Sequence, residues 1–125
     1  MAPTEETIMF DHIGLKTARL DAAVRFYGAA LESLGSGLCS RDDSGAGFGP
    51  PGAPALWLSV GTAGPVHVAF RAADRASVDR FHVAGLAAGG RDNGGPGLRL
   101  DYGPSYYAAF LLDPDGNNVE AVCLR

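Results

Sequence analysis

Residues 113–123 read Asp-Pro-Asp-Gly-Asn-Asn-Val-Glu-Ala-Val-Cys, which is typical of a tight turn followed by a short apolar strand. Pro114 presets its backbone angle, the Asp113 side chain can bond the turn backbone, and Gly116 accepts a positive φ. The strand carries one carboxylate, Glu120, among apolar neighbours. Burying that carboxylate is costly unless a charged or hydrogen-bonding group meets it. The rest of the sequence must therefore supply a partner for Glu120.

Two earlier segments share one pattern, a strand followed by an amphipathic helix. The first has an alternating strand over 8–16 and an apolar helical stripe that ends before Gly35. The second has a strand over 65–71 and a helix that Asp74 can cap. Residues 55 positions apart are identical at several places, and five of these pair His12 with His67, Arg25 with Arg80, Phe26 with Phe81, Leu31 with Leu86 and Gly35 with Gly90. This self-similarity predicts an internal duplication.

Three further strands are expected in each copy. The first set covers about 38–42, 46–49 and 55–60, and the second covers about 98–102, 106–112 and 119–124, with Gly- and Pro-rich turns between them. The sequence thus predicts an α+β protein in which the order β-α-β-β-β occurs twice. We expect one domain, residues 1–125, with module one over about 8–61 and module two over about 65–124.

Composition narrows the class of protein. The formal net charge is -4 and no basic cluster is present, which disfavours nucleic acid as a partner. No signal-peptide pattern and no apolar run of about 18–20 residues occurs, so we expect a cytoplasmic protein that does not bind a membrane. The two cysteines, Cys39 and Cys123, are too few for a disulfide framework or a zinc finger, and we interpret both as packing residues.

Strand parity places His12, His67 and Glu120 on one face of the predicted sheet, away from the aliphatic side that should pack on the helices. Two imidazoles and a carboxylate form a competent site for a divalent metal and are typical of non-haem iron centres. A lone strand histidine is more often an ordinary hydrogen-bonded residue. The equivalent positions of these two histidines in the repeat, and the otherwise unexplained Glu120, favour the metal site. His82 lies on a helix and receives no functional role.

The sequence resembles the vicinal oxygen chelate superfamily, which includes glyoxalase I, fosfomycin-resistance thiol transferases, extradiol dioxygenases, methylmalonyl-CoA epimerase and bleomycin-resistance proteins. The resemblance rests on Asp-His-Ile-Gly-Leu at 11–15, Phe-Tyr at 26–27, Val-His-Val-Ala-Phe at 66–70 and the stretch 113–122. It covers about residues 8–124. It implies paired βαβββ modules that form a curved mixed sheet around a metal- and ligand-binding hollow, with the helices on the outer face. One scaffold hosts many activities, so the resemblance does not specify the reaction.

The resemblance also implies a ligand set. It places one divalent metal ion, iron, manganese, nickel or zinc, on His12, His67 and Glu120. The fourth position used by glyoxalase I and the epimerase falls in residues 55–60, which contain no Asp, Glu or His. The three-ligand pattern is that of the fosfomycin enzymes and the dioxygenases.

The resemblance and strand parity suggest further site residues. Tyr106 and Tyr102 are candidates for a proton donor or substrate-orienting group, and Trp57, Arg99 and Phe110 are candidates for substrate binding, although aromatic residues also fill cores. Two functions stay open: a metal-dependent enzyme, or a protein of the bleomycin-resistance type that sequesters a small molecule without turnover. A homodimer is expected, with the metal site inside one chain or shared between two.

Overall fold

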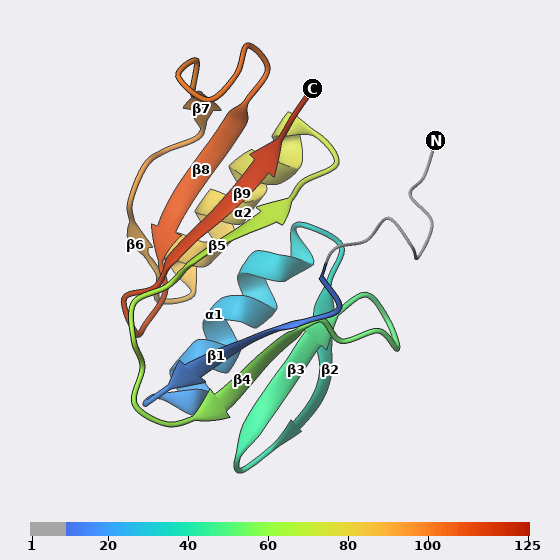
Figure 1. Ribbon diagram of the computed structural model, residues 1–125, viewed down its shortest axis with the longest axis vertical. Helices are drawn as coiled ribbons and strands as arrows, with labels where there is room; N and C mark the ends of the chain where they lie inside the picture. Colours follow the sequence, from blue (N-terminus) through green and yellow to red (C-terminus); the bar gives the residue numbers. More distant parts are fainter. Residues whose placement is uncertain (1–9) are drawn as a thin grey trace.

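The computed structural model describes residues 10–125 and consists of two modules, each with one helix and its own sheet (Figure 1). The first module contains β1 (Ile13–Thr17), α1 (Leu20–Glu32), β2 (Gly37–Asp42), β3 (Gly45–Gly49) and β4 (Leu56–Val60). The second contains β5 (His67–Arg71), α2 (Arg75–Ala87), β6 (Arg91–Asp92), β7 (Gly97–Leu98), β8 (Tyr107–Leu112) and β9 (Asn118–Cys123). The predicted α+β class and the repeated βαβββ order are confirmed.

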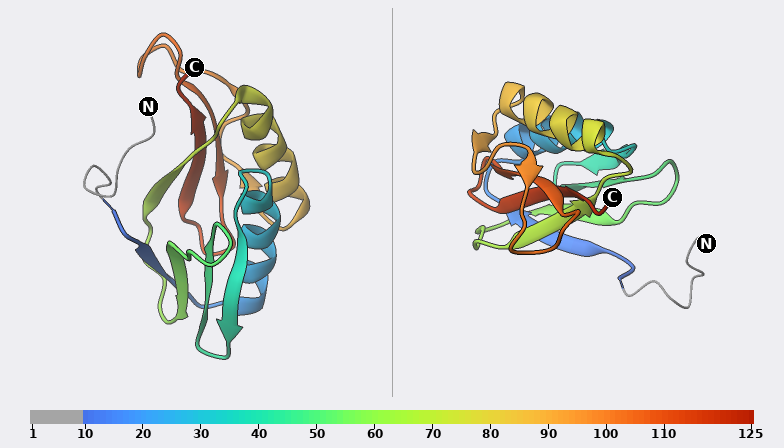
Figure 2. Two further views of the ribbon diagram at one scale, coloured as in Figure 1. Left: turned by 90° about the vertical axis from the view of Figure 1, so that its right-hand side faces the viewer. Right: turned by 90° about the horizontal axis from the view of Figure 1, so that it is seen from above.

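Both sheets have the same topology. Their strand orders are β1-β4-β3-β2 and β5-β9-β8-β6, with β7 also paired to β8. The first strand of each module runs parallel to the last, and the other neighbours are antiparallel. Both helices cover the same side of the sheets, which leaves the other side open (Figure 2). Within residues 10–125, neither helix has the length and apolar character needed to span a membrane.

The core lies between the helices and the sheets, and glycines let α2 approach closely. Phe26 and Phe81, which occupy equivalent positions in the repeat, are both fully buried. A Cβ atom on Gly85 would lie 2.2 Å from Leu111, and one on Gly90 would lie 2.4 Å from Phe26. A larger residue at position 85 would push α2 away from β8, and one at position 90 would push the segment after α2 away from α1.

The turn before β9 forms as its sequence predicts and also joins the modules. Gly116 has a φ of 90°, and Asp113 Oδ1 accepts hydrogen bonds from the backbone N–H groups of Asp115 and Asn117. Asp113 Oδ2 accepts from the Tyr27 hydroxyl on α1 at 2.6 Å and from Asn117 Nδ2 at 2.8 Å. These contacts hold the second module's turn against the first module's helix.

The first strand is shorter than predicted. It begins at Ile13, so Phe10, Asp11 and His12 precede it, while the predicted strand residues 8 and 9 lie outside the described residues. In the β1–β4 register Ile13 lies opposite Leu56, and continuing the ladder backwards would place Asp11 opposite Pro54. Proline has no N–H group to donate, so the ladder stops there.

The second module's sheet edge also differs from prediction. The strand expected over 98–102 is only Gly97–Leu98, because residues after it turn back, with Tyr102 N bonded to Arg99 O. The preceding segment forms the short strand β6 and then a bulge around Gly94, whose φ is 140°. One edge strand is therefore split into β6 and β7, which pair with opposite ends of β8.

The cysteines differ from one another. Cys123 is buried in the core, as expected for a packing residue. Cys39 is exposed, which corrects the interpretation that it packs inside. It lies on β2, the outermost strand of its sheet, and that strand is mostly exposed.

Candidate metal and substrate site

Glu120 is buried on the face of β9 that points away from the helices, with a relative exposure of only 2%. His67 Nε2 on β5 lies 3.0 Å from Glu120 Oε1. The Tyr106 hydroxyl, just before β8, donates to Glu120 Oε2 at 2.5 Å. Both carboxylate oxygens therefore have partners, and these contacts offset the cost of burying Glu120.

The imidazole of His67 is held in one orientation. Its Nδ1 lies 3.1 Å from the carbonyl oxygen of Asn118, its neighbour in the β5–β9 register. A carbonyl oxygen can only accept, so Nδ1 carries the hydrogen and Nε2 is the atom that faces Glu120. A ring lone pair and a carboxylate oxygen attract one another only through a cation between them, either a proton or a metal ion.

The pair fits a metal ion chemically. In metal-binding histidines, the ring nitrogen that does not bind the metal typically donates a hydrogen bond to a backbone carbonyl or a carboxylate, as Nδ1 of His67 does here. Two ligand atoms with bonds of about 2.1 Å at right angles are about 3 Å apart, close to the separation of His67 Nε2 and Glu120 Oε1. Half of the His67 side chain is exposed, so the pair opens to solvent on one side. His67 and Glu120 could therefore supply two of the ligands of a divalent cation.

Tyr106 is protonated at neutral pH. Burial, followed by its hydrogen bond to Glu120, raises the pKa of Tyr106 to about 12. Its ring packs edge-to-face on Tyr102, with 5.2 Å between ring centroids. Tyr106 therefore brings a proton to the edge of the site, and the exposed Tyr102 extends the aromatic wall around it.

A layer of side chains extends the site along β8. The Phe110 ring stacks on His67 with an interplanar angle of 24° and 6.4 Å between centroids. The Arg99 guanidinium lies over the Phe110 ring, 5.4 Å from its centroid, and donates to the carbonyl oxygen of Gly95 at 2.6 Å. A cation thus stands one aromatic ring away from the His67–Glu120 pair.

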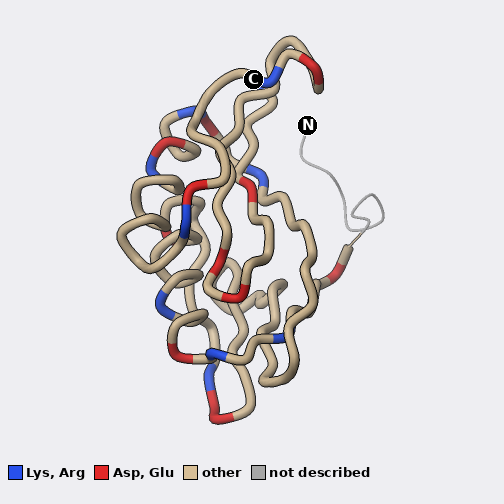
Figure 3. The backbone as a smooth tube through the Cα atoms, turned by 90° about the vertical axis from the view of Figure 1, so that its left-hand side faces the viewer, with Lys and Arg blue, Asp and Glu red and all other residues tan. Residues whose placement is uncertain are grey.

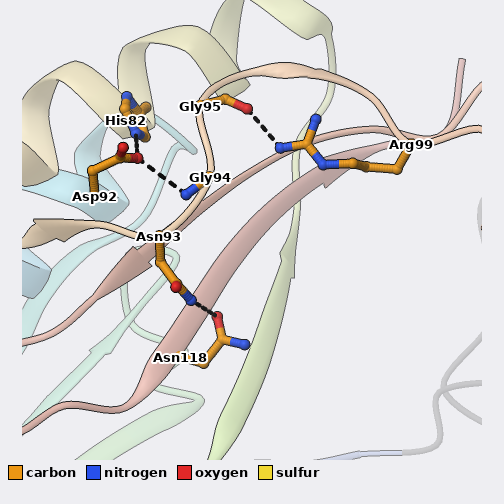
Figure 4. Close-up of polar contacts among 7 residues, drawn as sticks. All are labelled: His82, Asp92, Asn93, Gly94, Gly95, Arg99 and Asn118. Atoms are coloured by element: carbon orange, nitrogen blue, oxygen red, sulfur yellow. Dashed lines mark hydrogen bonds and ion pairs between the residues drawn. The ribbon is translucent and has the colours of Figure 1, made fainter.

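The sequence prediction did not include Asn118 and Asn93. Asn93 Nδ2 donates to Asn118 Oδ1 at 3.2 Å, and this contact ties the bulge between β6 and β7 to the site (Figure 4). The same bulge is held to α2 by His82 Nε2, which lies 2.9 Å from Asp92 Oδ1. Asn118 lies two residues before Glu120, so strand parity already places it on the site face.

Two predicted site residues belong to the first module and lie apart from this site. His12 precedes β1 and its Nδ1 contacts Asp11 Oδ1 at 2.7 Å, while Trp57 lies on β4. Among the described residues, neither has a hydrogen bond, ion pair or ring contact with His67, Glu120 or Tyr106. No three His, Cys, Asp or Glu side chains within residues 10–125 come together as a metal site. One chain therefore assembles two of the three predicted ligands.

Trp57 occupies the position in module one that Glu120 occupies in module two. Gly14 pairs with Trp57 across β1 and β4, and its counterpart Ala69 pairs with Glu120 across β5 and β9. The indole ring covers Gly47, where an added Cβ atom would lie 2.6 to 2.9 Å from ring carbons. A half-exposed aromatic surface thus replaces a fourth ligand, in line with the lack of Asp, Glu or His in residues 55–60.

Comparison with known proteins places this architecture. A glyoxalase/bleomycin resistance protein from Albidiferax ferrireducens T118 is 30% identical, with a TM-score of 0.80 over 93% of this chain and 98% of that one. A lactoylglutathione lyase from Agrobacterium tumefaciens is 21% identical, with a TM-score of 0.68 over 96% of each chain. A glyoxalase/bleomycin resistance protein/dioxygenase family enzyme from Burkholderia phytofirmans PsJN is 19% identical, with a TM-score of 0.70 over 92% of this chain and 98% of that one.

The fold of this chain and its similarity to the Albidiferax ferrireducens protein place it in the class of two-module βαβββ proteins. No protein-family model matches the chain. No curated protein matches its sequence. The chain belongs to the glyoxalase/bleomycin resistance family of the vicinal oxygen chelate superfamily. The other two similarities, at 21% and 19% identity, support the fold alone.

Proposed function

We propose that the protein is a cytoplasmic, divalent-metal-dependent enzyme that acts on a small substrate chelating the metal through oxygen atoms. The observation that carries this proposal is the pair formed by His67 Nε2 and Glu120 Oε1, 3.0 Å apart, with the ring oriented by the Asn118 carbonyl. Iron, manganese, nickel and zinc all accept imidazole and carboxylate ligands.

The third ligand in this proposal is His12 of the partner subunit. Each chain brings His67 and Glu120 together on one sheet and keeps His12 in the other module, so the set would be completed in a homodimer with two equivalent sites. The exposed position of His12 at the start of the edge strand β1 supports this arrangement. Isologous pairing would use the same contact twice.

The residues around the pair have distinct proposed roles. A bound divalent cation would act as a Lewis acid toward substrate oxygens. Tyr106 holds a proton at its hydroxyl and would donate it to, or orient, a substrate oxygen as negative charge develops. Tyr102 would support Tyr106 through their ring contact or take this role itself.

The substrate would lie between the side chains of Phe110 and Arg99 and the indole ring of the partner's Trp57. Phe110 would contact its apolar part, and Arg99 would bind a negatively charged or strongly polar group. The partner's Trp57 would cover the opposite side, because Trp57 lies on β4, which pairs with the strand that follows His12. These contacts would favour a small, planar or anionic molecule.

Elemental analysis of freshly purified protein, without chelator or added metal, tests the metal site. About one metal ion per chain is expected. The His12→Ala, His67→Ala and Glu120→Ala variants should each lose it, whereas His82→Ala should keep it because His82 lies on α2 and contacts Asp92. A wild-type protein that contains no metal and takes none up on titration would end the enzyme proposal.

Mixing two inactive variants tests whether the site is shared. In a dimer of one His12→Ala chain and one Glu120→Ala chain, a shared arrangement leaves one site with all three ligands intact and destroys the other. Metal binding should then return to about half the wild-type level in the mixed dimer. If every site lies within one chain, each site of the mixed dimer lacks one ligand and no binding returns.

A second function, sequestration of a small molecule without turnover, is supported by one observation. Both oxygens of Glu120 have protein partners, His67 and Tyr106. A purely hydrogen-bonding site could bind a ligand in the same hollow. Turnover of a diol, an epoxide or a 2-oxoaldehyde adduct by the metal-loaded protein would exclude this function.

A further inference from the structure

A depression of about 470 Å³ lies away from the His67–Glu120 pair, where the start of α1 meets the end of α2, β6 and the turn before β9. Three exposed arginines line it: Arg19 at the N-cap of α1, Arg25 on α1 and Arg91 on β6. The remaining lining consists of Ala22, Ala88, Gly89 and Pro114. We call this depression the arginine depression.

The arginine depression contains the start of a helix that has no side-chain cap. Arg19 occupies the N-cap position of α1, and its side chain has no acceptor atom, so the first-turn N–H groups receive no side-chain hydrogen bond from it. The repeat provides a contrast, because Asp74 caps α2 by accepting from Ser77 N at 2.7 Å. A positive residue at the positive end of a helix is unfavourable unless an anion lies nearby.

Two carboxylates lie beside the start of α1, and neither pairs with the three arginines. Asp21, in the first turn of α1, is ion-paired with Arg41 on β2. Asp115 accepts hydrogen bonds from the Thr17 hydroxyl and from Ala18 N. Within residues 10–125, the three arginines have no ion pair and no side-chain hydrogen bond. The depression thus holds three cationic side chains without a charged partner among the described residues, although the chain has a net charge of -4.

We propose that the arginine depression is a binding site for a phosphate group. Guanidinium groups from α1 and β6 can bind the oxygens of a phosphate, and uncapped helix N–H groups bind the same kind of anion. Figure 3 faces the side that carries β6 and the start of α1, where basic and acidic positions are interspersed, so no continuous basic stripe extends from the site. This local charge suits a small phosphorylated molecule and not a nucleic acid.

Titration with inorganic pyrophosphate at low ionic strength tests the proposal. Binding is monitored by amide NMR spectra and by thermal unfolding. The amide signals of Leu20, Asp21 and Ala22 should shift saturably, and the Tm should rise with ligand concentration. The double variant Arg19→Gln/Arg25→Gln should bind at least about tenfold more weakly. Added salt should weaken binding to the wild type, because the contacts are partly exposed.

Matched variants separate this site from other arginines. Arg80→Gln, the repeat counterpart of Arg25 on α2, should bind pyrophosphate as the wild type does. Arg99→Gln and Glu120→Ala should also leave binding unchanged, so the outcome is independent of the proposed enzymatic function. Arg19→Asp should raise the Tm without pyrophosphate by supplying a helix cap, and should abolish the rise caused by pyrophosphate.

Three results would overturn the proposal. The first is the absence of saturable amide shifts up to about 10 mM pyrophosphate. The second is signal changes that centre on Arg99 and not on the start of α1. The third is an equal loss of affinity in Arg80→Gln and in the double variant, which would indicate non-specific attraction between charges.

Discussion

At the scale of single residues, Glu120 shows how the sheet accommodates a buried carboxylate. Its neighbours in β9, Val119 and Ala121, point into the core, so Glu120 must face the other side of the sheet. Partners from the adjoining strands reach it there, His67 from β5 and Tyr106 from the segment before β8. Each partner is placed by strand pairing, so the polar group costs little as long as both remain.

Removal of the Tyr106 hydroxyl should leave one oxygen of a buried carboxylate without a donor. We expect Tyr106→Phe to lower the free energy of unfolding of the metal-free protein by about 2 kcal/mol, measured by urea denaturation. Tyr107→Phe is the matched control, because the neighbouring hydroxyl donates to Asp79 at the surface and its loss should cost less than about 1 kcal/mol. Equal losses in both variants would contradict a special role for Tyr106.

The pKa of Tyr106 offers a second test of the same contact. Burial and the hydrogen bond to Glu120 raise this pKa from 10.0 to about 12, so the folded state favours the protonated hydroxyl. The resulting stabilisation is complete below pH 10 and is lost as the pH rises toward 12. In Glu120→Gln, the pKa of Tyr106 should fall in part, because burial, the larger cause, remains, and this fall is seen as a change in the alkaline ultraviolet titration that is absent in Tyr106→Phe.

At the scale of elements, the two helices of the repeat begin differently. Asp74 caps α2, whereas Arg19 stands at the same place before α1. The Ser77 hydroxyl and backbone N–H hydrogen-bond Asp74 and hold its pKa below the ordinary value of 3.8. A lowered pKa means that the cap stabilises the fold above that value and is lost as the pH falls through the folded-state pKa.

Asp74→Ala should therefore lower the Tm by a few degrees at neutral pH. The difference from the wild type should shrink steadily as the pH falls below about 4. Asp101→Ala, at an exposed position without a hydrogen bond in the described part of the chain, serves as the control and should leave the Tm unchanged. A Tm difference for Asp74→Ala that persists at acid pH would mean that the charge of Asp74 is not what matters.

At the scale of the whole molecule, the turn at 113–117 joins the modules. Tyr27 and Asp113 are both buried, and burial, followed by the charge of Asp113, raises the pKa of Tyr27 far above its ordinary value. Its hydroxyl therefore stays protonated and donates across the boundary between the modules. Asn117 extends the connection by accepting from Val66 N, next to His67. One turn thus links the first helix to the strand that carries a predicted metal ligand.

Tyr27→Phe should lower the free energy of unfolding by about 2 kcal/mol, because it removes a buried hydrogen bond to a carboxylate. The fluorescence of Trp57, the only tryptophan, reports on module one, and far-UV circular dichroism reports on both modules. The two signals should still change in one transition, since the shared core remains. Separate transitions would show that this bond alone couples the modules.

Much of the fold and part of the site could be predicted from the sequence alone. The duplication follows from residues repeated 55 positions apart, because each copy must bury the same apolar stripe. The turn at Asp113 follows from residues with only a few allowed backbone conformations. The shared face of His67 and Glu120 follows from the two-residue period of strands, whereas the family resemblance selected the face of Tyr106 and Phe110. Local geometry decides all three features.

Features that depend on contacts between distant segments required the tertiary structure. His12 and His67 are equivalent in the repeat, yet only His67 lies beside Glu120, because each strand pairs within its own module. The interruption between β6 and β7 and the link from Asn93 to Asn118 depend on how the chain edge pairs with β8. The helical period places Arg19, Ala22 and Arg25 on one side of α1, whereas only tertiary packing brings Arg91 on β6 beside them. The sequence thus determined the elements and their faces, whereas the packing of the two modules determined which faces meet, since no local rule encodes contacts between residues far apart in the chain.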